Sequence, residues 1–391
     1  MKLYATAVIP SCRFEQLNRF LSVWRDERGR LPWHTTIIVW DGDVDGLGKA
    51  SDLVGKLSSE RERIFLYSQD DAKAVDPDYK FLSRGSSACR NLGYLKAIEH
   101  EPDFILTLDD DCHPVNLGTE EFECYDPSLF VSTHFVNMLQ SPLWVSTVPG
   151  HHLRGLPYCS SGYVPRTSWQ VKLDFPPVML SVGLWRGTPD LDAVHQLVRT
   201  NADMVAFKLP EGVRLMHPDQ FWPMSSMNMM FHKYLLPIMY MPPMGPRAGY
   251  DRFEDIWCGV LAQRVMRHLG LRACVGEPFV NHTRMSNMFI NLQKEAKGLQ
   301  CNEILYDVIN AIEMKPFEIR TASLTSVKVA MYQACQATID HFRSDSQREF
   351  FERHTPQASY FIDYLKNWWA TGLDCWLHEL SERNWLPHSH E

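Results

Sequence analysis

The chain has 391 residues, of which 45% are hydrophobic and 22% are charged, the composition of an ordinary globular protein. A net charge of −8 excludes a general electrostatic attraction to nucleic acids or anionic membranes, so any phosphate-bearing ligand must be held locally. The ten cysteines form no CxxC pair, no segment approaches the roughly 20 apolar residues of a membrane span, and the first residues lack a signal-peptide pattern. We therefore expect a cytoplasmic protein with no nucleic-acid partner and no transmembrane segment.

Strand and helix patterns alternate through the first hundred residues. Residues 4–11 (YATAVIPS) and 34–43 (HTTIIVWDGD) have the apolar, β-branched character of buried strands, whereas 13–27 and 86–100 carry apolar residues at helical spacing. A third strand is predicted at 103–111 (DFILTLDDD). This alternation indicates a parallel α/β sheet, a fold class in which ligands bind at the carboxyl ends of the strands.

The rest of the chain is less regular until its last third. Residues 115–250 contain many prolines, methionines and short apolar runs, which predict mixed strands and long loops built onto the first unit. Residues 252–270 (RFEDIWCGVLAQRVMRHLG) have the spacing of a helix, and amphipathic helices follow from about residue 320. We therefore divide the chain into a catalytic domain at 1–315 and a C-terminal helical region at 316–391.

Three consecutive acids follow the third predicted strand. If the strand geometry continues, Asp109 and Asp111 share one face and can converge on one hard divalent cation, Mn²⁺ or Mg²⁺. Such a cation would neutralise the diphosphate of a nucleotide. The alternative is a solvated acidic turn. The position after an apolar strand favours the metal site.

Four further side chains are candidates for binding a nucleotide. Asp41 and Asp43 follow the second strand and can accept hydrogen bonds from a base and a ribose, although Asp-Gly is also a common turn dipeptide. Arg84 and Arg90 flank the start of the helix at 86–100, where guanidinium and backbone N–H groups together suit a pyrophosphate. The alternative for each arginine is a solvated surface residue.

Nine short segments, taken in order, resemble the reversibly glycosylated polypeptides, which form the UDP-arabinopyranose mutase family. The resemblance covers roughly residues 4–310, and its segments are VIPS, VWDGD, SSACRNLGYLKA, LTLDDDC, LRGLPY, GLWRGTPDLDA, RFEDIW, HLGL and NHTRMSN. It implies a nucleotide-diphospho-sugar fold of the GT-A type, a mostly parallel sheet flanked by helices. It also implies a UDP-sugar ligand and a divalent metal.

The resemblance also assigns roles to individual residues. Arg154 in RGLPY matches the arginine that family members glycosylate reversibly. Glu254 and Asp255 match an acidic pair with a catalytic role, for which Asp255 is preferred. Asp109, Asp110 and Asp111 match the family's acidic triplet, which implies metal and diphosphate contacts there, and His282 matches a histidine that faces the metal. By its chemistry alone, Arg154 would be a phosphate or carboxylate clamp, because a protonated guanidinium is a poor nucleophile.

Two positions depart from the family pattern. A second family arginine is replaced by Ser161, with Arg166 as the nearest candidate, and the histidine before GLW is replaced by Val182. The predicted function is interconversion of the pyranose and furanose forms of a UDP-pentose, with self-glycosylation implied at Arg154. The departures keep one alternative open, a metal-dependent glycosyltransferase that uses a UDP-sugar donor. A second alternative is a non-catalytic UDP-sugar-binding subunit, against which the intact acidic triplet and Asp255 argue. The pattern does not distinguish a homo-oligomer from a hetero-oligomer.

Overall fold

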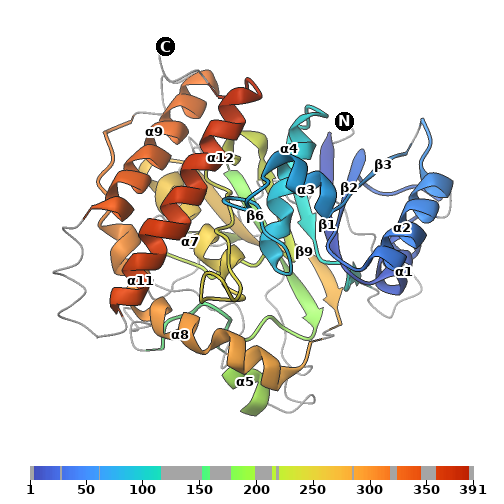
Figure 1. Ribbon diagram of the computed structural model, residues 1–391, viewed down its shortest axis with the longest axis horizontal. Coiled ribbons are helices and arrows are strands. Elements are labelled where there is room, and N and C mark those ends of the chain that lie inside the picture. Colours follow the sequence, from blue (N-terminus) through green and yellow to red (C-terminus); the bar gives the residue numbers. More distant parts are fainter. Residues whose placement is uncertain are drawn as a thin grey trace.

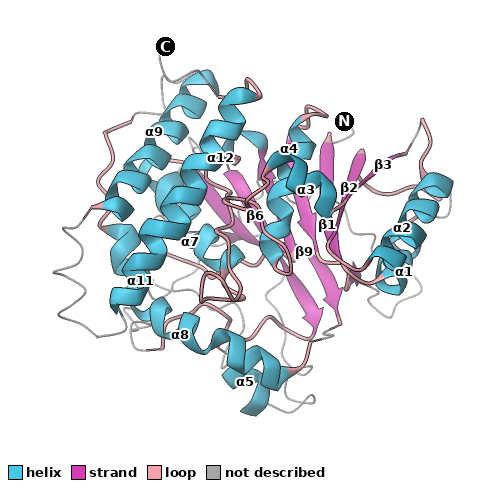
Figure 2. Cartoon of the chain, in the orientation of Figure 1, coloured by secondary structure: helices cyan, strands magenta, loops and turns pink. Residues whose placement is uncertain are grey.

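The computed structural model describes residues 4–26, 29–60, 62–115, 152–158, 178–198, 214–216, 220–283, 286–317, 324–344 and 358–386. Within these ranges a single nine-stranded sheet runs through the molecule, with helices around it (Figures 1 and 2). The strand order is β3-β2-β1-β4-β8-β6-β9-β5, and β7 pairs with β9.

The first four strands of the sheet are parallel. They are β1 (Ala5–Ser11), β2 (Thr35–Trp40), β3 (Arg63–Tyr67) and β4 (Phe104–Leu108). The helices between them are α1 (Phe14–Val23), α2 (Val44–Leu57), α3 (Gln69–Val75) and α4 (Arg90–Ile98), with a 3₁₀ turn, η1 (Ser87–Cys89), before α4. The three predicted strands and two predicted helices are all present, and α4 packs on β1 and β2.

The sequence pattern did not reveal α2, β3 and α3. Strand β3 lies at the edge of the sheet, and most of its side chains are half-buried. Its apolar run, IFLY, is only four residues long, and a run that short does not distinguish a strand from a buried helix segment by pattern alone. The N-terminal unit therefore contains one strand more than the sequence pattern indicated.

The second half of the sheet is mixed, whereas a mostly parallel sheet was expected. Strand β8 (Asn228–His232) pairs antiparallel with both β4 and β6 (Val178–Gly187), and β6 is parallel to β9 (Arg272–His282). The short strands β5 (Cys112–Pro114) and β7 (Arg214–Leu215) are antiparallel to β9. The sheet contains both parallel and antiparallel pairs because β8 runs opposite to both of its neighbours.

The C-terminal region is helical and shares its core with the sheet. Its elements are α9 (Leu324–Arg343), α11 (Ala358–Tyr364), the π-helix η5 (Leu365–Trp369) and α12 (Ala370–Glu382), and they lie together at the left of Figure 1. They pack on α7 (Glu254–His268), where Trp369 stacks on Trp257 with 6.2 Å between ring centroids. The Trp376 indole donates to the carbonyl of Leu236 at 3.2 Å. The helices therefore extend the core of the sheet.

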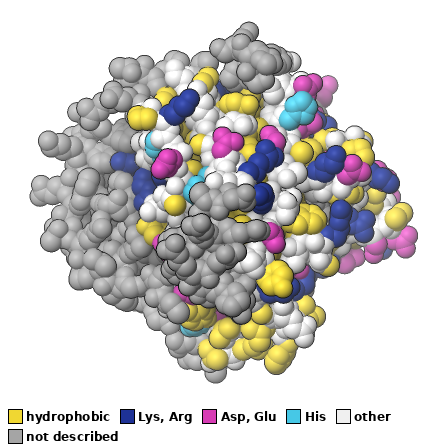
Figure 3. All heavy atoms as spheres, turned by 60° about the vertical axis from the view of Figure 1, so that its left-hand side comes forward, with side chains coloured by type: hydrophobic (Ala, Val, Ile, Leu, Met, Phe, Trp, Pro, Cys, Tyr) yellow, Lys and Arg dark blue, Asp and Glu magenta, His cyan; other side chains and the backbone are white. Residues whose placement is uncertain are grey.

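Two helices close the lower end of the molecule. They are α5 (Ala193–Val198) and α8 (Met288–Asn310), which contact each other. Hydrophobic side chains gather at this end in Figure 3, and the exposed apolar residues of the two helices are Val194, Val198, Phe289 and Ile290. None of the helices in the described ranges is both long and apolar enough to cross a membrane.

Candidate active site

A cavity of about 400 Å³ lies at the carboxyl ends of β1 and β4. Cys12 and Arg13 line it just after β1, and Asp109 and Asp111 line it just after β4. This is the edge at which parallel α/β sheets place their ligands. The residues predicted from the sequence that line the cavity are Arg90, Asp109, Asp111, Arg154, Glu254, Asp255 and His282.

Asp111 and His282 face each other across one side of this cavity. Asp111 Oδ1 lies 3.8 Å from His282 Nε2, and His282 Nδ1 lies 2.6 Å from the carbonyl oxygen of Thr188. Because a carbonyl oxygen only accepts, Nδ1 carries the hydrogen, and in the neutral ring Nε2 keeps its lone pair. Burial raises the pKa of Asp111 to about 6, with His282 acting in the opposite direction.

The Asp111 carboxylate and the His282 imidazole are suitable ligands for a divalent cation, but two protein ligands are few. In the described part of the chain, no group of three or more His, Cys, Asp and Glu side chains is placed to hold a metal ion. Asp109 is turned toward Arg90, whose guanidinium donates to Asp109 Oδ1 and to Thr107 Oγ1. A cation beside Asp111 and His282 would therefore need ligands from a bound phosphate and from water, as Mg²⁺ commonly does.

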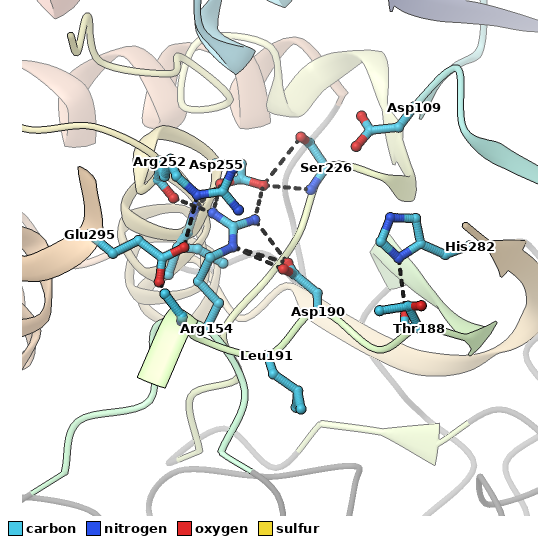
Figure 4. A network of polar contacts seen from close by, with 12 residues as sticks. Asp109, Arg154, Thr188, Asp190, Leu191, Ser226, Arg252, Asp255, His282 and Glu295 are labelled. Carbon is cyan, nitrogen blue, oxygen red and sulfur yellow. Dashed lines mark hydrogen bonds and ion pairs between the residues drawn. The ribbon is translucent and has the colours of Figure 1, made fainter. Parts of the chain in front are cut away.

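Arg154 forms the centre of a buried ion-pair network on another side of the cavity (Figure 4). Its Nε and Nη2 donate to Asp190 at 2.8 to 3.2 Å, and Nη1 and Nη2 each donate to Asp255 at 3.1 Å. Nη1 also donates to the carbonyl of Arg252. Burial disfavours the charged guanidinium, but Asp190 and Asp255 outweigh that effect and raise the pKa of Arg154. Arg154 therefore stays protonated.

Asp255 is held as firmly as Arg154. Besides Arg154, it accepts from the backbone N–H of Ser226 at 3.1 Å and from the Ser226 hydroxyl at 3.3 Å. Burial alone would raise the pKa of Asp255, but the Arg154 charge and these hydrogen bonds lower it. Asp255 is consequently an ionised partner of Arg154, and its carboxylate carries no proton to donate.

Glu254 differs from its neighbour Asp255. It is the first residue of α7 and is fully buried, and neither carboxyl oxygen has a hydrogen-bond partner. Burial, with Asp255 and Asp251 nearby, raises the pKa of Glu254 to about 7, although the backbone N–H of Glu254 itself and the Arg154 charge act in the opposite direction. The two acids thus differ in charge and in hydrogen bonding, and the sequence-based preference for Asp255 as the catalytic one, either as general base or by stabilising positive charge, stays a prediction.

The sequence pattern did not identify Asp190, Arg252 and Glu295. Arg252 Nε donates to Glu295 Oε1 at 2.8 Å, and Glu295 Oε2 accepts from the backbone N–H of Ala193 at 2.7 Å. Arg252 has a φ of +69°, a left-handed backbone conformation that brings its carbonyl to Arg154. Asp190 lies within the quoted segment GLWRGTPDLDA, so a search for the carboxylates that compensate Arg154 could have found it.

Four predicted binding residues do not line the cavity. Asp43 is exposed and caps α2, accepting from the backbone N–H of Gly46 at 2.6 Å. Asp110 is turned away from Asp109 and Asp111, and it accepts from the Ser11 hydroxyl at 2.6 Å. The alternation of the acidic triplet thus holds, although these residues form a turn and not a strand.

Asp41 and Arg84 lie next to the cavity without lining it. Asp41 accepts from the backbone N–H of Gly85, which does line the cavity, and from Gln69 Nε2 at 2.5 Å. Arg84 is exposed, and its charge acts on the Asp41 carboxylate. Asp41 is therefore placed to fix the loop at Gly85.

The two departures from the family pattern fall in different places. Val182 is buried in β6, opposite Met229 and Val275. Ser161 and Arg166 lie outside the described residues. Their relation to Arg154 stays a prediction.

The comparisons with known proteins agree on one family. A family model described as "Reversibly glycosylated polypeptide" matches residues 5–339. UDP-arabinopyranose mutase 1 of Arabidopsis thaliana is 29% identical, covering 91% of this chain and 88% of its own length. Probable UDP-arabinopyranose mutase 1 of Pisum sativum is 30% identical, covering 72% of this chain and 71% of its own length.

Similar solved structures are more distant. A Pyrobaculum calidifontis mannosyltransferase in complex with GDP-Man and Mn²⁺ is 12% identical, with a TM-score of 0.41 over 98% of this chain and 88% of that chain. Glucosyl-3-phosphoglycerate synthase of Mycobacterium tuberculosis is 11% identical, with a TM-score of 0.36 over 77% of this chain and 79% of that chain. Both TM-scores are low, so the fold class rests on the strand order of this chain and on its family.

Proposed function

Because the chain belongs to the reversibly glycosylated polypeptide family, we propose that it interconverts the pyranose and furanose forms of a UDP-pentose. The observation that carries the proposal is the cavity at the carboxyl ends of β1 and β4. It joins a carboxylate–imidazole pair suited to a diphosphate-bound cation with a buried arginine held between two carboxylates. The first set suits the departure and return of UDP, and the second borders the sugar.

Asp111 and His282 are the proposed protein ligands of Mn²⁺ or Mg²⁺. The Thr188 carbonyl accepts from Nδ1 and so holds the imidazole with Nε2 toward Asp111, as metal-binding histidines are commonly oriented by a hydrogen bond from their other ring nitrogen. A bound divalent cation would stabilise the negative charge that develops on UDP as it leaves the sugar. Arg90, which is buried and bonded to Asp109, positions that carboxylate at the same edge of the cavity.

Arg154 is the proposed group that holds the sugar while UDP is detached. Glycosylation there forms a bond from Nη2 to the anomeric carbon and breaks the bond from that carbon to the diphosphate oxygen. One proton leaves Nη2, and the Asp190 Oδ2 atom, 2.8 Å away, is placed to accept it. Return of UDP reverses each of these changes. Asp255 keeps the guanidinium in place from the other side.

Incubation of the purified protein with UDP-arabinopyranose and Mn²⁺, followed by chromatography of the nucleotide sugars, tests the proposal. A UDP-furanose product supports it. Free UDP without a furanose product indicates a transferase or a hydrolase and would refute the mutase assignment. No conversion of the substrate would leave the non-catalytic binding subunit as the better description. Omission of Mn²⁺ and addition of EDTA serve as the control for the metal.

A further inference from the structure

One carboxyl of the cavity is set apart from all the others by its lack of a cationic partner. Glu254 has no hydrogen-bond partner for either oxygen and no ion pair among the described residues. Each other carboxylate that lines the cavity faces a cationic group or an imidazole. The pairs are Asp109 with Arg90, Asp111 with His282, Asp190 and Asp255 with Arg154, and Asp251 with Lys294.

A carboxyl in this position holds its proton more tightly than an exposed one. Charge without a partner is strongly disfavoured in a buried site, so the neutral acid is the favoured form. The charged groups that act on Glu254 from its own segment are Asp251 and Asp255, which raise its pKa, and the Arg154 charge opposes them. From the packed elements, the Tyr364 phenol of α11 and the Cys89 thiol of η1 also lie within its electrostatic reach. None of these groups takes up its proton by a hydrogen bond.

The proposed reaction needs one group of this kind. When a pyranose becomes a furanose, the bond from the anomeric carbon to the old ring oxygen breaks, and that oxygen keeps the electron pair and takes a proton. Nη2 meanwhile gives its remaining proton to Asp255, 3.1 Å away, so that its electron pair can form a C=N bond to the anomeric carbon, and it takes that proton back when the new ring closes. A second hydroxyl then adds to the anomeric carbon and releases its proton. The two proton transfers cancel, so one residue that acts first as an acid and then as a base suffices.

We propose that Glu254 is this residue, giving its proton to the departing ring oxygen and taking one back from the hydroxyl that closes the new ring. The inference rests on the proposed function. Glu254 borders the cavity, but both of its carboxyl oxygens are buried. A rotation of its side chain toward the bound sugar is therefore part of the proposal, since catalytic hydrogen bonds often tighten only once the substrate is bound.

The test separates ring exchange from detachment of UDP. UDP-arabinopyranose is prepared with ¹⁸O in the oxygen that bridges the sugar and the diphosphate. Movement of ¹⁸O to a non-bridging position of the β-phosphate, followed by ³¹P NMR, reports cleavage and re-formation of the anomeric bond. Chromatography of the same samples reports the furanose product. Glu254→Gln, which cannot exchange a proton, is compared with Glu254→Asp and with the wild type.

In Glu254→Gln we expect furanose formation to fall about 10² to 10⁴-fold while ¹⁸O movement stays within a few-fold of the wild type. Glu254→Asp should recover part of the loss, because it keeps a titratable carboxyl. Asp374→Asn is the control. It makes the same carboxylate-to-amide change at an exposed ion pair with Arg343, outside the cavity lining, so the ratio of the two rates should not change.

Three results would overturn the assignment of Glu254. They are furanose formation at the wild-type rate in Glu254→Gln, a parallel fall of both rates with an unchanged melting temperature, and a loss in Glu254→Asp as deep as in Glu254→Gln. If Glu254→Gln does not fold, Glu254→Asp alone decides: furanose formation as low as in an unfolded variant, in a protein that still folds, overturns the assignment. If the wild type itself forms no furanose, the proposed function fails, which is a different and separately visible outcome.

Discussion

Removal of the Asp190 carboxylate should destabilise the protein far more than removal of an exposed acid. Asp190→Ala deletes the acceptor of hydrogen bonds from Arg154 Nε and Nη2 at 2.8 to 3.2 Å. Both side chains are less than 10% exposed, so water cannot replace the lost partner. Breaking a buried ion pair by removing one member costs about 3–5 kcal/mol. Asp255 still faces Arg154 after the change, which places the expected loss near the lower end of that range.

The free energy of unfolding is measured by urea titration, followed by tryptophan fluorescence. The control is Asp374→Ala, which removes a pair with Arg343 of the same length, 2.8 Å, but with side chains that are 46% and 43% exposed. An exposed pair of this kind is worth about 0–1 kcal/mol. If the free energy of unfolding falls by the same amount in Asp190→Ala and in Asp374→Ala, the buried ion-pair network does not stabilise the fold as its geometry indicates.

Four further changes test the site. Asp111→Asn should abolish turnover and weaken UDP binding, because an amide does not replace a carboxylate on a hard cation; activity that survives both this change and EDTA would exclude the metal role. Asp41→Ala should weaken UDP and UDP-sugar binding equally, by roughly 1.5–3 kcal/mol in calorimetry, and an unchanged UDP affinity would leave Asp41 no role beyond the turn. Arg154→Lys should lose the chaseable label that a labelled UDP-sugar leaves on the wild type, since lysine lacks the planar fork, and a label mapped elsewhere would contradict the assignment. Folding raises the pKa of Glu254 from 4.5 to about 7, so the protonated carboxyl stabilises the folded protein below pH 4.5. This stabilisation, about 3 kcal/mol, is lost as the pH rises from 4.5 to 7. Over this pH range the free energy of unfolding should therefore fall less in Glu254→Gln than in the wild type.

The sequence predicts the location of the site better than its internal connections. The acids after the strands at 34–43 and 103–111 mark the edge of the sheet where the cavity lies, because parallel strands end together there. What an apolar pattern cannot show is which acid faces the cavity. Asp43 caps α2 and Asp110 bonds to Ser11, and both outcomes depend on local backbone geometry.

The ordering of Glu254 and Asp255 illustrates the same limit. Both begin α7, where the helix dipole favours acids, so the local pattern treats them alike. Consecutive helical residues point about 100° apart, and only Asp255 is directed at Arg154. Its partners Arg154 and Ser226 are 101 and 29 residues away in the chain, so the pairing is a tertiary contact that no local pattern contains.

The short connection after β6 reaches both sides of the cavity within six residues. The Thr188 carbonyl accepts from His282, the Asp190 carboxylate accepts from Arg154, and the Ala193 N–H donates to Glu295. Insertion or deletion of one residue between Thr188 and Ala193 cannot preserve all three contacts. The three contacts therefore fix the length of this connection in this chain, so that its chemistry can be altered by substitution but not by a longer or shorter loop.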